Sequence, residues 1–541
     1  MKNKYLVVLN IILFFVVLFI MQYDGLTNYY NVDDDVRYLF FINNFPDNMQ
    51  DNLIAQHSYG KWVTTTIYYS NFYILANKFI DFIILGKIMG VLTFLLSIIF
   101  IYRLGKIIKN KRYALILTFL FILQPWLARP FQGGLSRSFA FLLLIVFLYY
   151  LIKKDRLKLS FVLLLEALIY PTVFLLSLAI FGLSLIDIKE KKIKIDLKQN
   201  YMFFIFAVLS FALILVPLNL VNYGLDDDIT FTEASLSPEF YEGGAYPFFI
   251  GSIPFTSDIK SIISTLTHLY SFNLINSPIY LNQLFVLFAL SVIFIIAYGK
   301  RIFNLPKEIY LLPVASLILQ TLAILLLFRL HIPSRYVQYS IPLFLIIIVA
   351  HGIYLLSIQK KLRYIFAILL LILAAFYINK LILIPQYNPV YCADEGVYDY
   401  LKTLPDDALI AGHPADMNCI ALFGQKRPFV MSILTSPLLK DYYSIMKQRD
   451  FDFFSAYYSS DKKQVRDFCK KNVITHIVVN KEHFTKEYLN QDYYYYSEQF
   501  EPFNINKHIK NLTKNKNEFY LMNPENVVYK TGNNFIVSCG Y

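Results

Sequence analysis

Three consecutive carboxylates, Asp33, Asp34 and Asp35, come shortly after the first apolar run of the chain, residues 5–22. A carboxylate can accept the proton of an attacking hydroxyl group and so act as a general base. A run of acidic residues is also often the solvated cap of a surface helix, and both interpretations stand. Because consecutive side chains on a helix point about 100° apart, only one or two of them would face a common site. We favour Asp34 or Asp35 as the base.

Basic side chains occupy the short connections between later apolar runs. Arg129 and Arg137 lie in one such connection, and Arg329, His331 and Arg335 lie in another. Placing a charge at the bilayer centre costs roughly 3 kcal/mol and less near the interface, so charges at this level indicate anionic partners. The candidates are the aspartates, lipid head groups or a phosphate, which arginine grips in bidentate fashion.

Two further charged residues are candidates for substrate binding. Arg37 would orient an aspartate or bind phosphate, or extend to the lipid head groups. Glu166 lies inside an apolar run, where an acid is a functional candidate, although pairing with an arginine explains it equally well. No Cys or His spacing specifies a metal site, although acidic clusters can recruit a divalent cation. We interpret the lone histidines His57, His268 and His413, which we expect in loops, as surface or structural residues rather than metal ligands.

A carboxylate cluster facing arginines at a membrane surface suits the transfer of a sugar from a lipid phosphate. The arginines would hold the phosphate while an acceptor hydroxyl group gives its proton to an aspartate. Attack on the anomeric carbon then expels the lipid phosphate, whose developing charge the guanidinium groups stabilise.

The composition predicts the scaffold that must position these residues. Of 541 residues, 57% are hydrophobic and the mean hydropathy is +0.48, as expected for a polytopic α-helical membrane protein. The net charge of +12 comes from Lys and Arg in short linkers, which argues against nucleic acid as a partner. The eleven predicted crossings are residues 5–22, 82–102, 113–128, 138–152, 159–170, 172–186, 201–221, 280–298, 308–328, 336–358 and 363–384.

The charges of the linkers predict the orientation. Lys and Arg concentrate in alternate connections, which places the N-terminus in the cytoplasm and the C-terminal part outside. The runs 159–170 and 172–186 are short for a bilayer and meet at Tyr170-Pro171, so we predict paired half-length helices there rather than one kinked helix. We expect a plasma-membrane protein, in a bacterial inner membrane.

Two long outer loops and a C-terminal domain complete the predicted organisation. The loop 23–81 should form short amphipathic helices on the membrane surface, and a second loop covers 222–279. We place the membrane domain at 1–385 and a small extracytoplasmic α/β domain at 386–541, where helix and strand patterns alternate. All four cysteines lie in this last part, which suits an oxidising compartment and leaves three pairings open.

The architecture and the Asp33–Asp35 run resemble the GT-C superfamily of membrane glycosyltransferases, which includes oligosaccharyltransferases, protein mannosyltransferases and aminoarabinose transferases. The stretches 34–37, 51–55 and 133–140 are similar to an uncharacterised bacterial group within it. The resemblance implies a polyprenyl-phosphate-linked sugar as donor and a first-loop aspartate as base, which maps onto Asp34 or Asp35. It leaves the acceptor open among glycans, lipids and proteins.

Two other classes of function compete with a transferase. A transporter or flippase of lipid-linked saccharide would use the same arginines for phosphate, but the chain lacks the inverted repeat with matching broken helices that is typical of carriers. A surface or assembly protein without catalysis would use the acidic loop to bind a partner.

Overall fold

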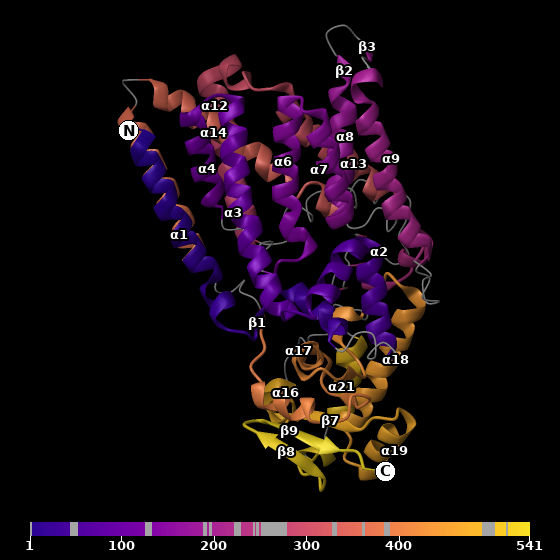
Figure 1. Cartoon of the computed structure of the whole chain (residues 1–541). Coiled ribbons are helices and arrows are strands. Elements are labelled where there is room, and N and C mark those ends of the chain that lie inside the picture. Colours follow the sequence, from indigo (N-terminus) through magenta and orange to yellow (C-terminus); the bar gives the residue numbers. More distant parts are fainter. Residues whose placement is uncertain are drawn as a thin grey trace. The chain divides into compact units, whose positions relative to one another are not determined.

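The computed structural model describes most of the chain (Figure 1). The described residues are 3–43, 52–124, 133–187, 192–193, 197–220, 229–241, 244, 248–249, 278–326, 333–359, 363–382, 390–489, 504–514 and 518–540.

The chain separates into two compact units, each built from several stretches of sequence. The first unit is Met1–Asp34, Val63–Leu220 and Tyr270–Val390, and the second is Asp35–Trp62, Val221–Leu269 and Tyr391–Tyr541. The units do not follow the predicted boundary between domains 1–385 and 386–541, because parts of both outer loops, 23–81 and 222–279, belong to the second unit. The domain boundary therefore stays a prediction.

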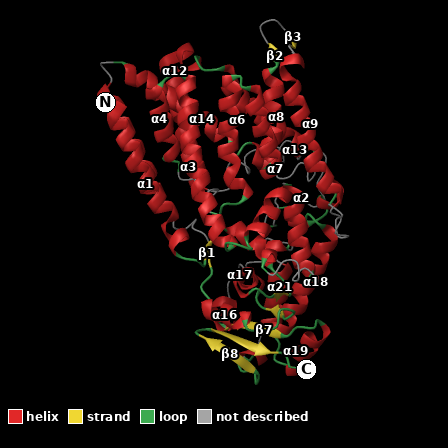
Figure 2. Ribbon diagram, in the orientation of Figure 1, coloured by secondary structure: helices red, strands yellow, loops and turns green. Residues whose placement is uncertain are grey.

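The first unit is almost entirely helical (Figure 2). Its helices are α1 (Asn3–Thr27), α3 (Phe82–Ile108), α4 (Lys111–Ile122), η4 (Ser136–Phe139), α6 (Ala140–Lys153), α7 (Arg156–Ile169), α8 (Pro171–Ser184), α9 (Leu197–Leu220), α12 (Pro278–Tyr298), η6 (Gly299–Phe303), α13 (Lys307–Leu325), η7 (Pro333–Tyr336), α14 (Ser340–Ile358) and α15 (Arg363–Ile382). Short strands are β1 (Asn31–Val32), the antiparallel pair β2 (Ile186–Asp187) and β3 (Lys192–Ile193), and β4 (Val390–Tyr391). Each of the eleven apolar runs thus forms a helix.

Polar residues at the helix starts explain several boundaries. The side chain of Asp81 accepts hydrogen bonds from the first backbone N–H groups of α3, and Asn110 does the same for α4. Asp155 caps α7 in the same way. Pro171 occupies the first turn of α8, where a missing N–H costs nothing, and it also ends α7 at the preceding residues. The predicted break at Tyr170-Pro171 is confirmed.

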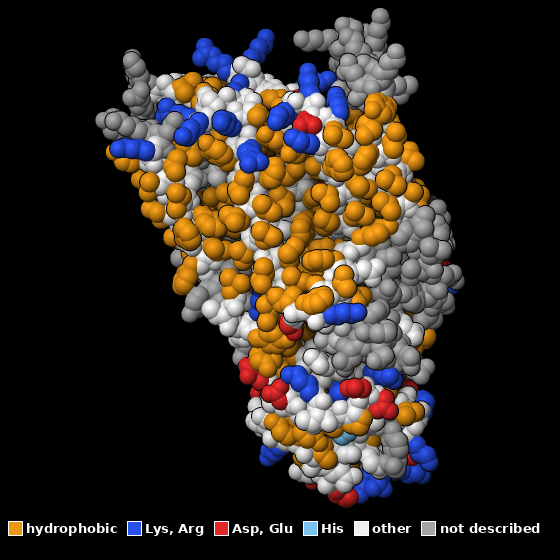
Figure 3. Space-filling model, viewed as in Figure 1, with side chains coloured by type: hydrophobic (Ala, Val, Ile, Leu, Met, Phe, Trp, Pro, Cys, Tyr) orange, Lys and Arg blue, Asp and Glu red, His pale blue; other side chains and the backbone are white. Residues whose placement is uncertain are grey.

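The outer surface of these helices fits an apolar surrounding. Among the described residues, five helices are long and apolar enough to cross a membrane, including α3 and α14 with the 3-10 turn before it. Hydrophobic side chains cover the visible face of this unit, and Lys and Arg gather at one end of its helices (Figure 3). The prediction of a polytopic helical membrane protein is confirmed in this coarse form. The count of eleven crossings and the orientation stay predictions.

The second unit contains a mixed five-stranded sheet in the order β6-β5-β7-β9-β8. Strands β6 (Arg427–Pro428), β5 (Leu409–Ala411) and β7 (His476–Asn480) are parallel, whereas β9 (Asn534–Ser538) and β8 (Val527–Thr531) continue the sheet antiparallel. Its helices are α10 (Phe231–Ala234), η5 (Pro238–Phe240), α16 (Glu395–Lys402), α17 (Pro414–Gly424), η10 (Ser432–Leu434), α18 (Lys440–Tyr457), α19 (Lys462–Lys471), η11 (Lys481–Phe484), α20 (Lys486–Leu489), α21 (Asn504–Thr513) and η12 (Tyr520–Met522).

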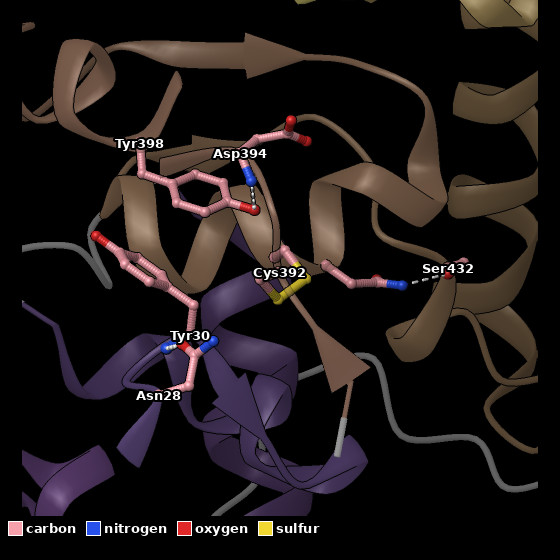
Figure 4. The surroundings of a disulfide bond; sticks show 8 residues. Asn28, Tyr30, Cys392, Asp394, Tyr398 and Ser432 are labelled. Carbon is pink, nitrogen blue, oxygen red and sulfur yellow. Dashed lines mark hydrogen bonds between the residues drawn. A yellow bond between two sulfur atoms is a disulfide. The ribbon is translucent and has the colours of Figure 1, made fainter. Parts of the chain in front are cut away.

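Two disulfides and an aromatic core stabilise the second unit. Cys392 pairs with Cys419 (Figure 4), and Cys469 pairs with Cys539, so one of the three possible pairings is selected. The second disulfide links α19 to the end of the sheet. Around it, apolar side chains of α18, α19, β7 and β9 form a buried cluster that includes Phe454. Burial of this apolar surface is the main stabilising contribution to such a unit.

The first outer loop differs from its prediction. Instead of only short surface helices, it forms the 3-10 helix η1 (Asp34–Ile42) and one long helix, α2 (Leu53–Ala76), of 24 residues. The sequence of α2 mixes polar and aromatic residues without a clear helical period, which hid its length. Of the two interpretations given for the lone histidines, surface or structural, the structural one holds for His57 and His413, because both are buried; His268 lies outside the described residues. His57 stacks on Tyr442 of α18 at 3.6 Å between ring centroids.

Candidate functional site

The centre of the candidate site is an ion pair between two residues far apart in the sequence. Asp33 lies directly before η1, and its carboxylate accepts a hydrogen bond from the guanidinium group of Arg137 in η4. Both side chains are almost completely buried, with 2% of Asp33 and 12% of Arg137 exposed. A charge in such a place must be paired, so Asp33 fixes the position of Arg137. These are two of the residues that the sequence singled out.

The glycine pair before η4 explains how Arg137 reaches this position. Gly134 has a positive φ of 58°, and a Cβ atom there would lie 2.0 Å from the carbonyl oxygen of Gly86 in α3. A Cβ atom at Gly86 would in turn lie 2.7 Å from the carbonyl oxygen of Gly133. Only glycine permits both this backbone conformation and this close approach. The chain before η4 therefore lies directly against α3.

Two tyrosines of α2 hold the same stretch from another side. The Tyr73 hydroxyl group donates a hydrogen bond to the carbonyl oxygen of Gly134 at 2.8 Å, and the Tyr69 hydroxyl group donates to the same oxygen. Both tyrosines are buried. With Gly86, they fix the start of η4 and hence the direction of Arg137.

The chain leading to the aspartates is anchored on α3. Lys87 donates hydrogen bonds to the carbonyl oxygens of Asn28 at 2.6 Å and Tyr29 at 3.4 Å. The Tyr29 hydroxyl group donates to the carboxylate of Asp81, the residue that caps α3, at 2.9 Å. Helix α3 thus positions both partners of the ion pair, Asp33 through these contacts and Arg137 through the glycine contact.

Tyr170, at the junction of α7 and α8, brings a second arginine to the site. The guanidinium groups of Arg335 and Arg137 both act electrostatically on its phenol group, although they come from η7 and η4. The rings of Tyr170 and Tyr339 also meet edge to face, with 6.0 Å between their centroids. Arg335 itself donates a hydrogen bond to Gln338 at 3.3 Å and is half-buried. The break between the half-length helices is therefore near enough to both arginines to feel their charge.

Glu166 makes a different contact from the predicted one. It is fully buried in α7, and its Oε1 atom accepts a hydrogen bond from Ser177 of α8 at 2.8 Å. Its Oε2 atom has no hydrogen-bond partner among the described residues. Pairing with an arginine is therefore not observed in the described part of the chain, and Glu166 joins the two short helices instead.

The other predicted site residues are described only in part. Asp34 and Asp35 belong to η1, but their side chains lie outside the described residues, as do Arg129, Arg329 and His331 altogether. Arg37 is half-buried in η1.

A second polar cluster lies in the second unit. His413, Asp416 and His483 each offer a ligand atom, and these atoms lie within 4.8 Å of one another. Burial lowers the pKa of His413 far below its usual value, as does the neighbouring His483, whose own pKa burial lowers to about 4. Burial, together with the nearby carboxylates Asp394 and Glu482, raises the pKa of Asp416 to about 7. The two imidazoles are therefore neutral at physiological pH.

Sequence reasoning missed the residues that support the ion pair. Lys87 could have been recognised from the sequence, because it is a cation inside an apolar run and such residues usually have a function. The sequence gives no such indication for Gly86, Tyr69 and Tyr73. Glycines and tyrosines occur throughout this chain, and only the fold brings these three together. The pair His413 and His483 was missed because they are far apart in the sequence.

Comparison with known proteins gives only distant similarity. No protein-family model and no curated protein matches the chain. Among solved structures, the chain is similar to the archaeal oligosaccharyltransferase AglB from Archaeoglobus fulgidus, in complex with an inhibitory peptide and a dolichol-phosphate. The identity is 10%, the TM-score is 0.48, and 90% of this chain and 71% of that chain are covered. A structure of the oligosaccharyltransferase from the same organism, tethered with an acceptor peptide, gives 12% identity and a TM-score of 0.47, with 90% and 70% covered.

A second kind of structure covers nearly the whole chain. ArnT from Cupriavidus metallidurans, bound to undecaprenyl phosphate, gives 11% identity and a TM-score of 0.40, with 99% of this chain and 98% of that chain covered. An oligosaccharyltransferase is one of the GT-C proteins named by the sequence resemblance. At TM-scores below 0.5, however, the likeness carries no conclusion about family or activity.

Proposed function

We propose that the chain is an integral membrane glycosyltransferase that moves a sugar from a polyprenyl-phosphate donor to an acceptor on the outer face of the membrane. The observation that supports the proposal most is the buried ion pair that fixes Arg137 on Asp33, close to Tyr170, where the charge of Arg335 also acts. Two guanidinium groups beside an apolar helical surface suit a ligand that joins a phosphate to a lipid chain.

Each residue then has a distinct role in the transfer step. Arg137 and Arg335 bind the phosphate of the donor, and Asp33 holds Arg137 in place. Asp34 or Asp35 accepts the proton of the acceptor hydroxyl group as its oxygen forms a bond to the anomeric carbon. The bond between that carbon and the phosphate oxygen breaks, and the lipid phosphate leaves with the electron pair. The guanidinium groups stabilise its increased charge.

The buried ion pair makes Asp33 the least suitable of the three aspartates as a base. Its carboxylate already accepts a hydrogen bond from Arg137, and a nearby positive charge favours the ionised form and weakens its proton affinity. Removal of Asp33 would take this carboxylate away from the buried guanidinium group of Arg137. We therefore assign Asp33 to positioning and keep proton transfer for the residues that follow it.

Retention of a polyprenyl phosphate tests the binding half of the proposal. Undecaprenyl phosphate, the lipid held by the ArnT structure, serves as the probe, and native mass spectrometry of the detergent-purified full chain measures its retention. We expect Arg137→Ala and Arg335→Ala each to reduce retention about tenfold or more, since a charged hydrogen bond contributes roughly 1.5–3 kcal/mol.

Arg103→Ala is a matched control, because Arg103 lies towards the C-terminal end of α3, where its guanidinium group lies over the ring of Phe100. This variant should retain the lipid like the unaltered protein. Equal retention by all three variants would remove the arginines from the donor site. Lipid retention without any sugar transfer, across a panel of polyprenyl-phosphate sugars, would favour a transporter of lipid-linked saccharide.

A further inference from the structure

We infer that His413, Asp416 and His483 form a binding site for a divalent transition-metal ion, with Zn²⁺ as the best-fitting ion. The site lies in the second unit and does not depend on the proposed transfer reaction. Two imidazole nitrogens and a carboxylate oxygen are donors that zinc prefers, and three protein ligands leave a fourth position for water or an external group.

The topology of the sheet explains why these residues meet. His413 follows β5 directly and precedes the first turn of α17, and His483 lies in η11 directly after β7. Strands β5 and β7 are parallel neighbours, so their carboxyl ends lie side by side. Residues at this edge of a parallel sheet commonly form binding sites, because the chain turns there and exposes side chains from several strands to one point. Asp416 lies in the first turn of α17 and therefore near the same edge of the sheet.

One pair of ligand atoms already lies close to the separation found around a bound ion. His483 presents Nε2 towards the carboxylate of Asp416 at 3.8 Å. Ligand atoms that surround zinc tetrahedrally at about 2.1 Å lie about 3.4 Å apart, so the His483–Asp416 pair needs to close by a few tenths of an ångström. The three ligand atoms lie within 4.8 Å of one another, so the widest separation needs to close by up to about 1.4 Å. The imidazole rings of His413 and His483 lie 4.2 Å apart between centroids at an angle of 44°, so their planes are tilted rather than stacked.

Neighbouring tyrosines orient both imidazoles. The Tyr457 hydroxyl group forms a hydrogen bond with Nδ1 of His483 at 3.2 Å, which leaves Nε2 directed at Asp416. The Tyr488 hydroxyl group forms one with Nε2 of His413 at 3.0 Å. Such second contacts fix the ring orientation of metal-binding histidines in known sites. Both histidines are buried, whereas 33% of the Asp416 side chain is exposed, so an ion can enter on the side of Asp416.

Zinc retention by the full chain tests this inference. The detergent-purified protein is treated with a chelator, supplied with Zn²⁺ alone, desalted, and analysed for metal content and thermal stability. We expect one zinc ion per chain and a higher apparent Tm, because an ion that binds only the folded state stabilises it. Asp416→Asn should weaken zinc affinity about tenfold or more and abolish the increase in Tm.

Asp399→Asn is the matched control, since Asp399 is an exposed residue of the same unit and pairs only with Lys402 in the described structure. It should bind zinc like the unaltered chain. His483→Gln is a second test of the ligand set, and Asp416→Asn decides the question if that variant does not fold. Failure of the unaltered chain to retain zinc would overturn the inference, and so would equal zinc binding by Asp416→Asn.

Discussion

Replacement of Gly134 by alanine tests how the candidate site is held together. Gly134 has a φ of 58°, and an added Cβ atom would lie 2.0 Å from the backbone oxygen of Gly86. The left-handed conformation costs a non-glycine residue about 1–2 kcal/mol. The steric conflict adds about 1–3 kcal/mol, because the opposing atom is backbone of a long helix and cannot rotate away. We therefore expect Gly134→Ala to cost about 2–5 kcal/mol and to displace Arg137.

Two other glycines separate the contributions to this cost. Gly299 has a positive φ of 49° with no atom within 4 Å of an added Cβ, so Gly299→Ala measures conformational strain alone, about 1–2 kcal/mol. Gly182 lies within α8, also with nothing within 4 Å, and Gly182→Ala should be neutral or stabilising by up to about 1 kcal/mol.

Thermal unfolding of the full chain in detergent and retention of undecaprenyl phosphate are the two assays for this series. Gly134→Ala should lower the apparent Tm most and should also reduce lipid retention, whereas the other two variants should retain the lipid normally. If Gly134→Ala is no more destabilising than Gly299→Ala, the close contact with α3 is refuted. If it destabilises the chain but leaves lipid retention unchanged, the link between this contact and Arg137 is refuted.

Two further predictions concern the second unit. Burial raises the pKa of Asp450 well above its usual value of 3.8, so the folded chain keeps a proton that the unfolded chain loses, and stability falls as the pH rises above about 4. Asp450→Asn should therefore raise the apparent Tm at pH 7 but not at pH 4, because each unit by which burial raises the pKa corresponds to roughly 1.4 kcal/mol. Asp441→Asn, at an exposed site of the same helix, is the control variant. Cys539→Ser removes the disulfide with Cys469, which should cost about 2–5 kcal/mol and change the mobility of the unreduced chain in gel electrophoresis; unchanged mobility would contradict the pairing.

The apolar runs and the helix-breaking proline residues predicted much of the local structure. All eleven apolar runs form helices, because a long apolar stretch has few other ways to satisfy its backbone hydrogen bonds. The predicted break at Tyr170-Pro171 is present, since proline excludes the helical conformation from the residue before it. The strand patterns at Ala408–Ala411 and Ile474–Val479 predicted two strands, and these are present as β5 and β7. The last two strands, β8 and β9, lie in the tail from residue 481. Its Tyr, Asn and Lys residues show no periodic pattern from which strands could be predicted.

The candidate site was predictable only in part, because its geometry depends on long-range contacts. Charges in apolar surroundings are costly, so Asp33, Arg137 and Arg335 were recognisable by type and position. The partner of each charge was not, since Arg137 follows Asp33 by about a hundred residues. Gly134 appeared only within the stretch 133–140 that carries the resemblance, and its contact with Gly86 exists only in the folded chain.

Sugar transfer by the double variant Asp34→Asn with Asp35→Asn tests the central claim most directly. The unaltered chain and the double variant are compared for release of polyprenyl phosphate from a polyprenyl-phosphate sugar, with retention of undecaprenyl phosphate as the check on folding and binding. The proposed mechanism predicts normal lipid retention and a loss of transfer of about a hundredfold or more, as expected when a general base is removed. Transfer at an undiminished rate by the double variant would contradict it.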